Sequence, residues 1–409
     1  MSWLKRLGIV MGAITGLLLL WVAVGAVVYS PEYVGRVLTS RESSVDDYLH
    51  MFPLRSLSAS ATPFSFDEDP NEGAVRGAFE SVLGVSDLDA FLAEAETQAF
   101  IVIKDDKILY EGYFNGTRRD SVVTSFSVAK SFDSALIGIA IDEGLIGSVD
   151  DAITDYLPEL ADRSIGFEKI TIRDLLLMAS GLDYQELRWF LFNGDDPLTT
   201  YYTDQREISL NNTNIIDPPA QYFLYNKYHP QLLGMILERT TGMSVADYTQ
   251  TRLWDRIGME YDGAWALDSE GSGFEKMEAG LNARAIDFAK FGRLYLNGGN
   301  WDGQQVISAE WVEESTSLAE TTHNPDYYAR SFGPSIYDDG NGYYKYMWYG
   351  KLREGQPPDI AAEGDHGQFI YMSPANRVII VRNGTGYGIA SSEWIDAFYR
   401  AASDLGGDR

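Results

Sequence analysis

The sequence predicts an α+β fold in which strands from both ends of the chain form one antiparallel sheet flanked by helices, with a mostly helical subdomain inserted. Strand-like runs occur early, in AFIVIKD and ILYEGYF, and late, in GQFIYMSP and RVIIVRN. They are rich in β-branched and aromatic residues, as strands are. Between them, residues 145–330 are mainly helical and loop-like. Strands at both ends around a helical middle favour one sheet built from the two chain ends.

The first part of the chain predicts a membrane segment. Residues 7–29 form a run of 23 residues without a charge. At about 1.5 Å per residue, a helix of this length spans the ~30 Å hydrocarbon layer. Lys5 and Arg6 precede the run, so the positive-inside rule places the N-terminus in the cytoplasm and the body on the periplasmic or extracytoplasmic side. A cleaved signal peptide is the alternative, but its apolar core is usually about 7 to 15 residues long. We therefore expect residues 1–29 to be an uncleaved anchor.

The rest of the chain divides into an extension and one main domain. Residues 30–75 contain Ser-rich and Pro-containing pieces, which indicate a spacer, with residues 51–54 docking on the main domain. The main domain covers residues 76–409. We expect it to open with a helix over 86–97 and a hairpin that turns at 105–107. We expect a further helix to begin near Ser127, and later helices over 170–181, 229–242, 283–299 and 391–403. The first three of these four ranges each end on a Gly suited to a helix C-terminus.

Composition excludes several classes of protein. The formal charge of −28 and the lack of a basic cluster oppose nucleic-acid binding. The chain has no cysteine, which excludes disulfides and thiolate sites. Its four histidines are scattered without metal-ligand spacing, so we expect no metal and no cofactor.

A Ser-x-x-Lys pair stands out in TSFSVAKSFDSALIGIA, residues 124–140. Apolar residues recur behind it at helical spacing, which indicates a buried central helix. Ser127 and Lys130 lie three apart and so share one helix face. The pair fits a nucleophile and its base, but Ser127 also fits a helix N-cap.

A serine nucleophile needs a base, and an ordinary lysine is protonated at neutral pH. A buried Lys–Tyr pair would lower the pKa of one or both groups. We therefore expect a tyrosine just ahead of a downstream helix. Tyr225 in FLYNKYHPQLLGMILERTTG has that position.

Five segments together resemble the penicillin-recognising serine hydrolases, in the branch that holds class C β-lactamases, esterases and 6-aminohexanoate-dimer hydrolases. In chain order they are SFSVAKSF, ITIRDLLLMASGL, FLYNKYHPQLLGMILERTTG, AGLNARAIDFAKFGRLYLNGG and AAEGDHGQFIYMSPANRVIIVRNG. The resemblance covers about 300 residues, from near Ala99 to the final helix. It implies a β-lactamase/transpeptidase-like fold.

The resemblance also implies roles for residues. Ser127 would be the acylated nucleophile, Lys130 its base, and Tyr225 the group that passes a proton to the leaving group. The family's Lys-Thr-Gly element corresponds to Asp365-His366-Gly367, and the oxyanion hole would be formed by the backbone N–H groups of Ser127 and Gln368. His366 would either orient the substrate or have a purely structural role.

This sequence departs from the family pattern at two places. Lys227 stands where the family has Asn or Ser two residues after the tyrosine, so either Asn226 serves instead or a lysine faces the substrate. Asp365 replaces the lysine that would meet a β-lactam carboxylate, which favours ester or amide hydrolysis. Trp189, Tyr201 and Tyr202 are candidates to line the site.

The sequence thus predicts a membrane-anchored serine hydrolase that acts on a small ester or amide. Two alternatives remain. One is a D-alanyl-D-alanine carboxypeptidase or β-lactamase, and the other is a non-catalytic binder of cell-wall peptides or β-lactams.

Overall fold

A computed structural model describes residues 3–40, 44–186, 192–319, 324–330 and 340–407. Its centre is an eight-stranded sheet in the order β10-β11-β12-β13-β14-β3-β4-β2. Neighbouring strands are antiparallel except β2 and β4. In sheet order the strands are Gly342–Lys345, Trp348–Arg353, Gln356–Gly364, Gln368–Ser373, Val378–Gly384, Thr97–Lys104, Lys107–Tyr113 and Asp67–Glu68. Because β14 pairs with β3, the two ends of the domain meet in one sheet as predicted.

The hairpin of β3 and β4 follows the expected pattern. Asp105 and Asp106 form its two-residue turn with φ of 50° and 63°, the left-handed values that a tight hairpin turn requires. Lys107, which we expected in the turn, already belongs to β4. Side chains of β3 alternate between two cores: Phe100 and Val102 face one, and Ile101 and Ile103 face the other.

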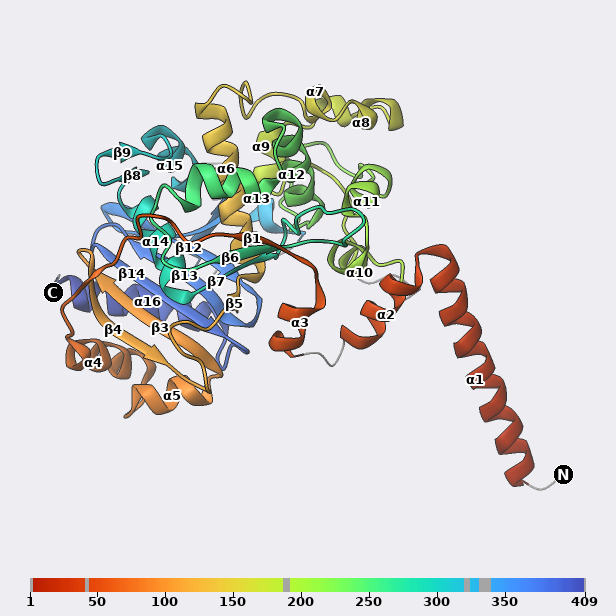
Figure 1. The fold of residues 1–409 in the computed structure, drawn as a ribbon, viewed down its shortest axis with the longest axis horizontal. Helices are drawn as coiled ribbons and strands as arrows, with labels where there is room; N and C mark the ends of the chain where they lie inside the picture. Colours follow the sequence, from red (N-terminus) through yellow and green to blue (C-terminus); the bar gives the residue numbers. More distant parts are fainter. Residues whose placement is uncertain (1–2, 41–43, 187–191, 320–323, 331–339, 408–409) are drawn as a thin grey trace.

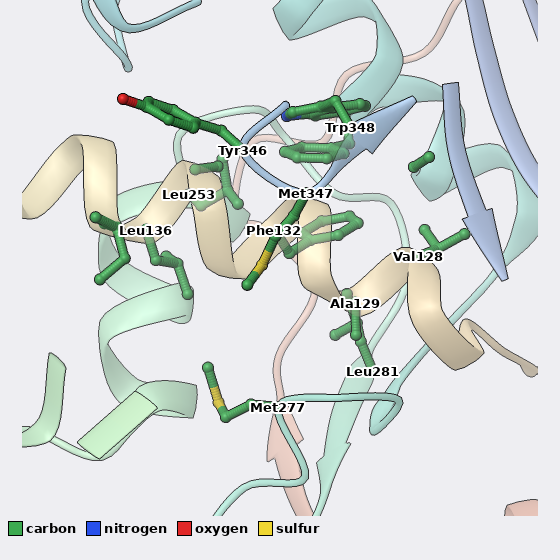
Figure 2. Close-up of a cluster of buried hydrophobic side chains, with 14 of the residues drawn as sticks. Val128, Ala129, Phe132, Leu136, Leu253, Met277, Leu281, Tyr346, Met347 and Trp348 are labelled. Carbon is green, nitrogen blue, oxygen red and sulfur yellow. The ribbon is translucent and has the colours of Figure 1, made fainter. Parts of the chain in front are cut away.

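Helices cover both faces of this sheet (Figure 1). On one face α4 (Glu72–Leu83) and α16 (Ser391–Gly406) pack with α5 (Leu88–Glu94). On the other face lie α6 (Ala129–Asp142) and α14 (Ala285–Leu296). Figure 2 shows apolar side chains packed around α6, and the ring of Phe132 stacks on that of Phe291 at 3.7 Å. Helix α4 was not predicted from the sequence, and part of it falls in the expected spacer.

The inserted subdomain is mostly helical, as predicted. Its helices are α7 (Ile153–Tyr156), α8 (Pro158–Arg163), α9 (Ile172–Leu176), α10 (Asp195–Tyr201), α11 (Gln205–Asn211), α12 (Tyr228–Thr241) and α13 (Val245–Thr249). Helix α12 ends on Gly242 with φ of 66°, the expected glycine cap. Helix α9 is shorter than expected: it is capped by Leu177, and Gly181 lies beyond it with φ of 77°.

A second, four-stranded sheet has the order β1-β6-β7-β5, with strands Leu54–Leu57, Gly263–Ala266, Leu281–Ala283 and Val123–Thr124. A small ribbon of β8 (Asn300–Trp301) and β9 (Gln304–Gln305) precedes α15 (Ala309–Thr316). The pairing of β1 with β6 attaches the segment after residue 53 to the body of the protein.

The expected spacer is structured and packs on the domain (Figure 1). Helix α1 (Trp3–Val28) continues into α2 (Pro31–Ser40), and α3 (Val45–Met51) follows. The Tyr33 hydroxyl donates to Phe192 O at 2.8 Å, and Arg36 donates to Asp268 O at 2.6 Å. The apolar run from Lys5 to Val28 is long enough to cross a membrane, with an 18-residue window of mean hydropathy 2.4 that is not buried. The end of the run packs on the protein through Trp21.

Candidate active site

Ser127 lies at a sharp change of direction between a strand and a helix. After β5, the chain enters a single 3₁₀ turn (Phe126–Val128) and then α6. Phe126 has φ of 43°, a left-handed value that is strained for a bulky residue. The residues at the N-cap positions of the 3₁₀ turn and of α6 are Ser125 and Val128. Ser127 therefore caps neither element, and its hydroxyl is available for other contacts.

Lys130 lies one turn further on and its side chain is 1% exposed. Its Nζ is 2.9 Å from Ser127 Oγ and donates to Glu278 O at 2.6 Å. Burial, followed by repulsion from Lys227, lowers the pKa of Lys130 to about 7, against the opposing pull of Glu278, Asp133 and Asp196. Near neutral pH a large share of this amine is uncharged, so it can accept the Ser127 proton.

Tyr225 completes the cluster from the loop before α12. Leu224 N donates to Met178 O at 2.8 Å, which ties this loop to the segment just after α9. The Tyr225 hydroxyl is hydrogen-bonded to the Ser127 side chain, and Lys130 Nζ lies 5.0 Å from the centre of its ring. Burial raises the pKa of Tyr225 to about 12, while Ser127 and Lys227 pull it down. The two groups are thus shifted in opposite directions, and the tyrosine stays protonated.

The two residues after Tyr225 point to different places. Asn226 is fully buried: its amide donates to Leu182 O at 3.3 Å, and its oxygen accepts from Tyr228 N at 2.9 Å. Lys227 lines the pocket, where its Nζ donates to Asp196 Oδ1 at 2.5 Å and to Thr200 Oγ1 at 3.0 Å. Burial opposes the charge of Lys227, but Asp196, together with Glu278 and Tyr225, raises the pKa of this lysine above its usual value. A lysine, and not Asn226, faces the site.

The glycine that meets the serine is Gly364, at the end of β12. A Cβ added there would lie 2.4 Å from Ser125 O and 3.1 Å from Ser127 N, so this approach requires glycine. Of the expected third element, Asp365 and His366 line the pocket with Gly364, and Gly367 and Gln368 lie outside its lining.

The side chain of Gln368 joins strands. Its amide donates to Gly384 O at 2.7 Å, and its oxygen accepts from Asn383 at 3.0 Å. The His366 ring packs 5.0 Å from that of Phe126, and its Nδ1 lies 3.1 Å from Thr385 O. His366 itself has φ of 59°, so its loop turns sharply past the pocket.

The pocket around Ser127 has a volume of about 510 Å³. Its wall is rich in tyrosines and carboxylates: Tyr48, Tyr184, Tyr201, Tyr225, Tyr349, Tyr387, Glu186, Asp196, Glu278, Glu363 and Asp365. Of the expected aromatic residues, Tyr201 lines this pocket and Tyr202 packs on Tyr33 at 5.5 Å. Trp189 lies outside the described residues. Within the described ranges, no group of three His, Cys, Asp or Glu side chains could hold a metal.

Three contributors to the site were missed by the sequence analysis. Glu278 supplies a backbone oxygen to Lys130, Asp196 pairs with Lys227, and Tyr48 reaches the pocket from the N-terminal extension. None belongs to a recognisable motif. Gly364 had one signal, a glycine where a strand ends in AAEGDHG.

Comparison with known proteins agrees with this geometry. The beta-lactamase family model matches residues 88–393. A 6-aminohexanoate-dimer hydrolase of Paenarthrobacter ureafaciens is 27% identical over 310 residues, which cover 72% of this chain and 74% of the relative.

Two solved structures show the same fold. A putative 6-aminohexanoate-dimer hydrolase from Bacillus anthracis superposes with a TM-score of 0.70 at 23% identity, covering 88% of this chain and 92% of the other. A family VIII carboxylesterase superposes with a TM-score of 0.59 at 17% identity, covering 83% and 99%. With three quarters of its length matched by the family model, this chain belongs to the beta-lactamase family of serine hydrolases.

Proposed function

We propose that the protein hydrolyses an ester or amide through an acyl-enzyme on Ser127, with Lys130 and Tyr225 as proton-transfer groups. The observation that carries the proposal is the convergence of three side chains on one pocket: Ser127 Oγ is in contact with Lys130 Nζ and is hydrogen-bonded to the Tyr225 hydroxyl. A nucleophile held against a base of matched pKa is the arrangement that covalent catalysis needs.

Acylation would use the uncharged form of Lys130. The Ser127 hydroxyl proton passes to Lys130 Nζ as Oγ attacks the carbonyl carbon, and the carbonyl π electrons move to its oxygen. The hydrogen bond from Lys130 Nζ to Glu278 O keeps the amine oriented during this transfer. We propose that the resulting oxyanion is bound by the backbone N–H groups of Ser127 and Asp365, because Gly364 brings this strand end against Ser127.

Collapse of this intermediate breaks the bond to the leaving group. Tyr225, protonated at neutral pH, gives its proton to the departing oxygen or nitrogen and regains one from the Lys130 ammonium. A water molecule then attacks the acyl carbon and gives up its proton to the same amine. The bond between the acyl carbon and Ser127 Oγ breaks, the Lys130 ammonium returns the proton to Oγ, and the acid is released. Each proton returns to its starting place in one cycle.

The charges that line the pocket bear on the substrate class. Asp365 lines the pocket, and Asp196 pairs with Lys227, which leaves little free positive charge for a β-lactam carboxylate. The names of the relatives, a 6-aminohexanoate-dimer hydrolase and a carboxylesterase, are of amide- and ester-cleaving enzymes. We therefore favour an ester or amide over a β-lactam or a D-alanyl-D-alanine peptide.

We also propose that α1 anchors the enzyme in a membrane, with the catalytic domain on the extracytoplasmic side. Its apolar run is long enough to span a bilayer, and Lys5 and Arg6 lie at its start.

A substrate panel tests the reaction. Purified full-length protein is assayed with p-nitrophenyl butyrate, the linear 6-aminohexanoate dimer and a chromogenic cephalosporin. We expect turnover of the ester or the linear amide that exceeds cephalosporin turnover by at least about tenfold in kcat/KM, a difference of ~1.4 kcal/mol. If cephalosporin turnover were faster than both, the protein would be a β-lactamase. If none of the three substrates were hydrolysed, it would be a non-catalytic binder.

Lys227 should set the pH at which the enzyme works. In a Lys227→Met variant a positive charge near Lys130 is lost and Asp196 loses its partner, and both changes raise the pKa of Lys130. The acidic limb of the kcat/KM profile should move to higher pH. A rise of one unit from about 7 lowers the uncharged fraction at pH 7 roughly fivefold. Lys227→Arg keeps the charge and is the matched control; equal midpoints in the Met and Arg variants would refute this role.

A further inference from the structure

The segment that links the membrane helix to the domain forms part of the active-site wall. Ser40 from α2, and Ser44, Val45 and Tyr48 at α3, line the same pocket as Ser127. This segment precedes residues 88–393, the part of the chain that the family model matches. It therefore lies outside the part of the chain that the family model matches.

Tyr48 packs against the turn that carries Ser127. Its ring packs 4.9 Å from that of Phe126, the neighbour of Ser127, and 5.3 Å from that of Phe52. The residue is 9% exposed, and its buried hydroxyl has no hydrogen-bond partner within the described ranges. The groups whose charges act on this hydroxyl are Glu278, Tyr201, Asp196 and Asp365, and all of them line the pocket. Tyr48 thus lies among the acidic groups of the pocket wall.

An unpaired buried hydroxyl is costly for a protein to keep. Leaving such a donor unsatisfied destabilises a fold, and a phenylalanine would fill the same space without that cost. Burial and the neighbouring acidic groups raise the pKa of Tyr48 well above its usual range, so the group is a hydrogen-bond donor at every working pH. Because Tyr48 lies in the wall of the catalytic pocket, its hydroxyl is suited to donate a hydrogen bond to an acceptor atom of a bound ligand.

We propose that Tyr48 is a substrate-binding residue whose hydroxyl donates a hydrogen bond to an oxygen of the ester or amide bound at Ser127. This inference rests on the proposed function and adds to it a specificity-determining residue from the N-terminal segment.

The segment is held firmly enough for this role. Ser44 caps α3 by accepting from Asp47 N at 3.1 Å, and the Asp47 side chain accepts in return from Ser44 N at 2.8 Å. Arg36 ties α2 to the subdomain through Tyr201 O at 3.2 Å as well as Asp268 O. Trp21, in the last turns of α1, stacks on Phe192 at 4.6 Å. Tyr48 is placed by packing and need not be ordered by the substrate, which preserves binding energy.

A Tyr48→Phe variant of the full-length protein in detergent tests the inference with p-nitrophenyl butyrate. We expect KM to rise about three- to tenfold, the value of one hydrogen bond, with kcat within about twofold of wild type. Tm should stay equal or rise, because the variant removes an unpaired buried group. Tyr295→Phe is the matched control: Tyr295 is a buried tyrosine of α14 outside the pocket lining, and its variant should leave KM unchanged.

Labelling with a fluorophosphonate probe separates the two proposals. If Tyr48→Phe still reacts at Ser127 but shows an unchanged KM, the substrate-binding role is refuted and the proposed function stands. A rise in KM accompanied by a fall in Tm also refutes it, since the hydroxyl would then be structural. If wild-type protein shows no Ser127-dependent labelling, the proposed function fails, and the role of Tyr48 fails with it.

Discussion

A Ser127→Ala variant should lose about 10⁴- to 10⁶-fold in kcat against any substrate that the wild-type enzyme hydrolyses. The substitution removes the only atom that can form the acyl bond in the proposed mechanism, and Lys130 and Tyr225 then have no proton to exchange. The variant should remain folded, because Ser127 caps neither the 3₁₀ turn nor α6. Initial rates with p-nitrophenyl butyrate, together with a melting curve, measure both quantities.

Ser134→Ala is the matched control for this variant. Ser134 lies two turns further along α6, is fully buried, and its hydroxyl has no partner among the described residues. Removing that hydroxyl should leave kcat within about twofold of wild type and should not lower Tm. A Ser127→Ala enzyme that keeps more than about a tenth of wild-type kcat would contradict the assignment of the nucleophile.

Lys130→Met should cost about 10²- to 10⁴-fold in kcat/KM, the range of a general base. Because burial and Lys227 lower the pKa of Lys130 to about 7, the base is uncharged above that pH and protonated below it. Wild-type kcat/KM should therefore rise with pH through about 7, with a tenfold loss per unit well below the midpoint. The profile measured from pH 5 to 9 checks this sign.

Lys130→Arg distinguishes a base from a charge. Arginine keeps the positive charge but stays protonated at every pH, so this variant should be as inactive as Lys130→Met. If Lys130→Arg retained wild-type activity, or if the wild-type profile were flat across pH 7, Lys130 would be acting as a fixed charge and not as a proton acceptor.

The regular part of the fold was readable from the sequence because its signals are local. The β3–β4 hairpin follows from β-branched runs around a two-residue Asp–Asp turn, and the end of α12 follows from Gly242. One sheet built from strands of both chain ends was correctly expected, and β14 and β3 are the strands that join the two ends. Helix α4 was missed because it lies in a stretch whose Ser- and Pro-containing neighbours suggested a spacer.

The site was only partly predictable from the sequence, because only some of its signals are local. The spacing of Ser127 and Lys130 is a local signal, and it correctly anticipated that the two side chains lie together. The opposite pKa shifts of Lys130 and Tyr225 come mainly from burial, and repulsion from Lys227 adds to the shift of Lys130; the burial is a result of tertiary packing. The third element was expected at residues 365–367, but the glycine that approaches Ser127 is Gly364, three residues before Gly367. This approach is a contact between distant segments, which no local signal reveals. The position of Tyr48 is likewise a result of packing between an N-terminal helix and the catalytic turn.

The central claim is that Ser127 becomes covalently acylated, and peptide mass spectrometry after reaction with a fluorophosphonate tests it most directly. Wild-type protein should carry one probe adduct on the peptide that contains Ser127, and excess p-nitrophenyl butyrate should slow its formation. The Ser127→Ala variant should carry none, whereas Ser134→Ala should react like wild type. An adduct on a different residue, or folded wild-type protein that forms no adduct, would contradict the account.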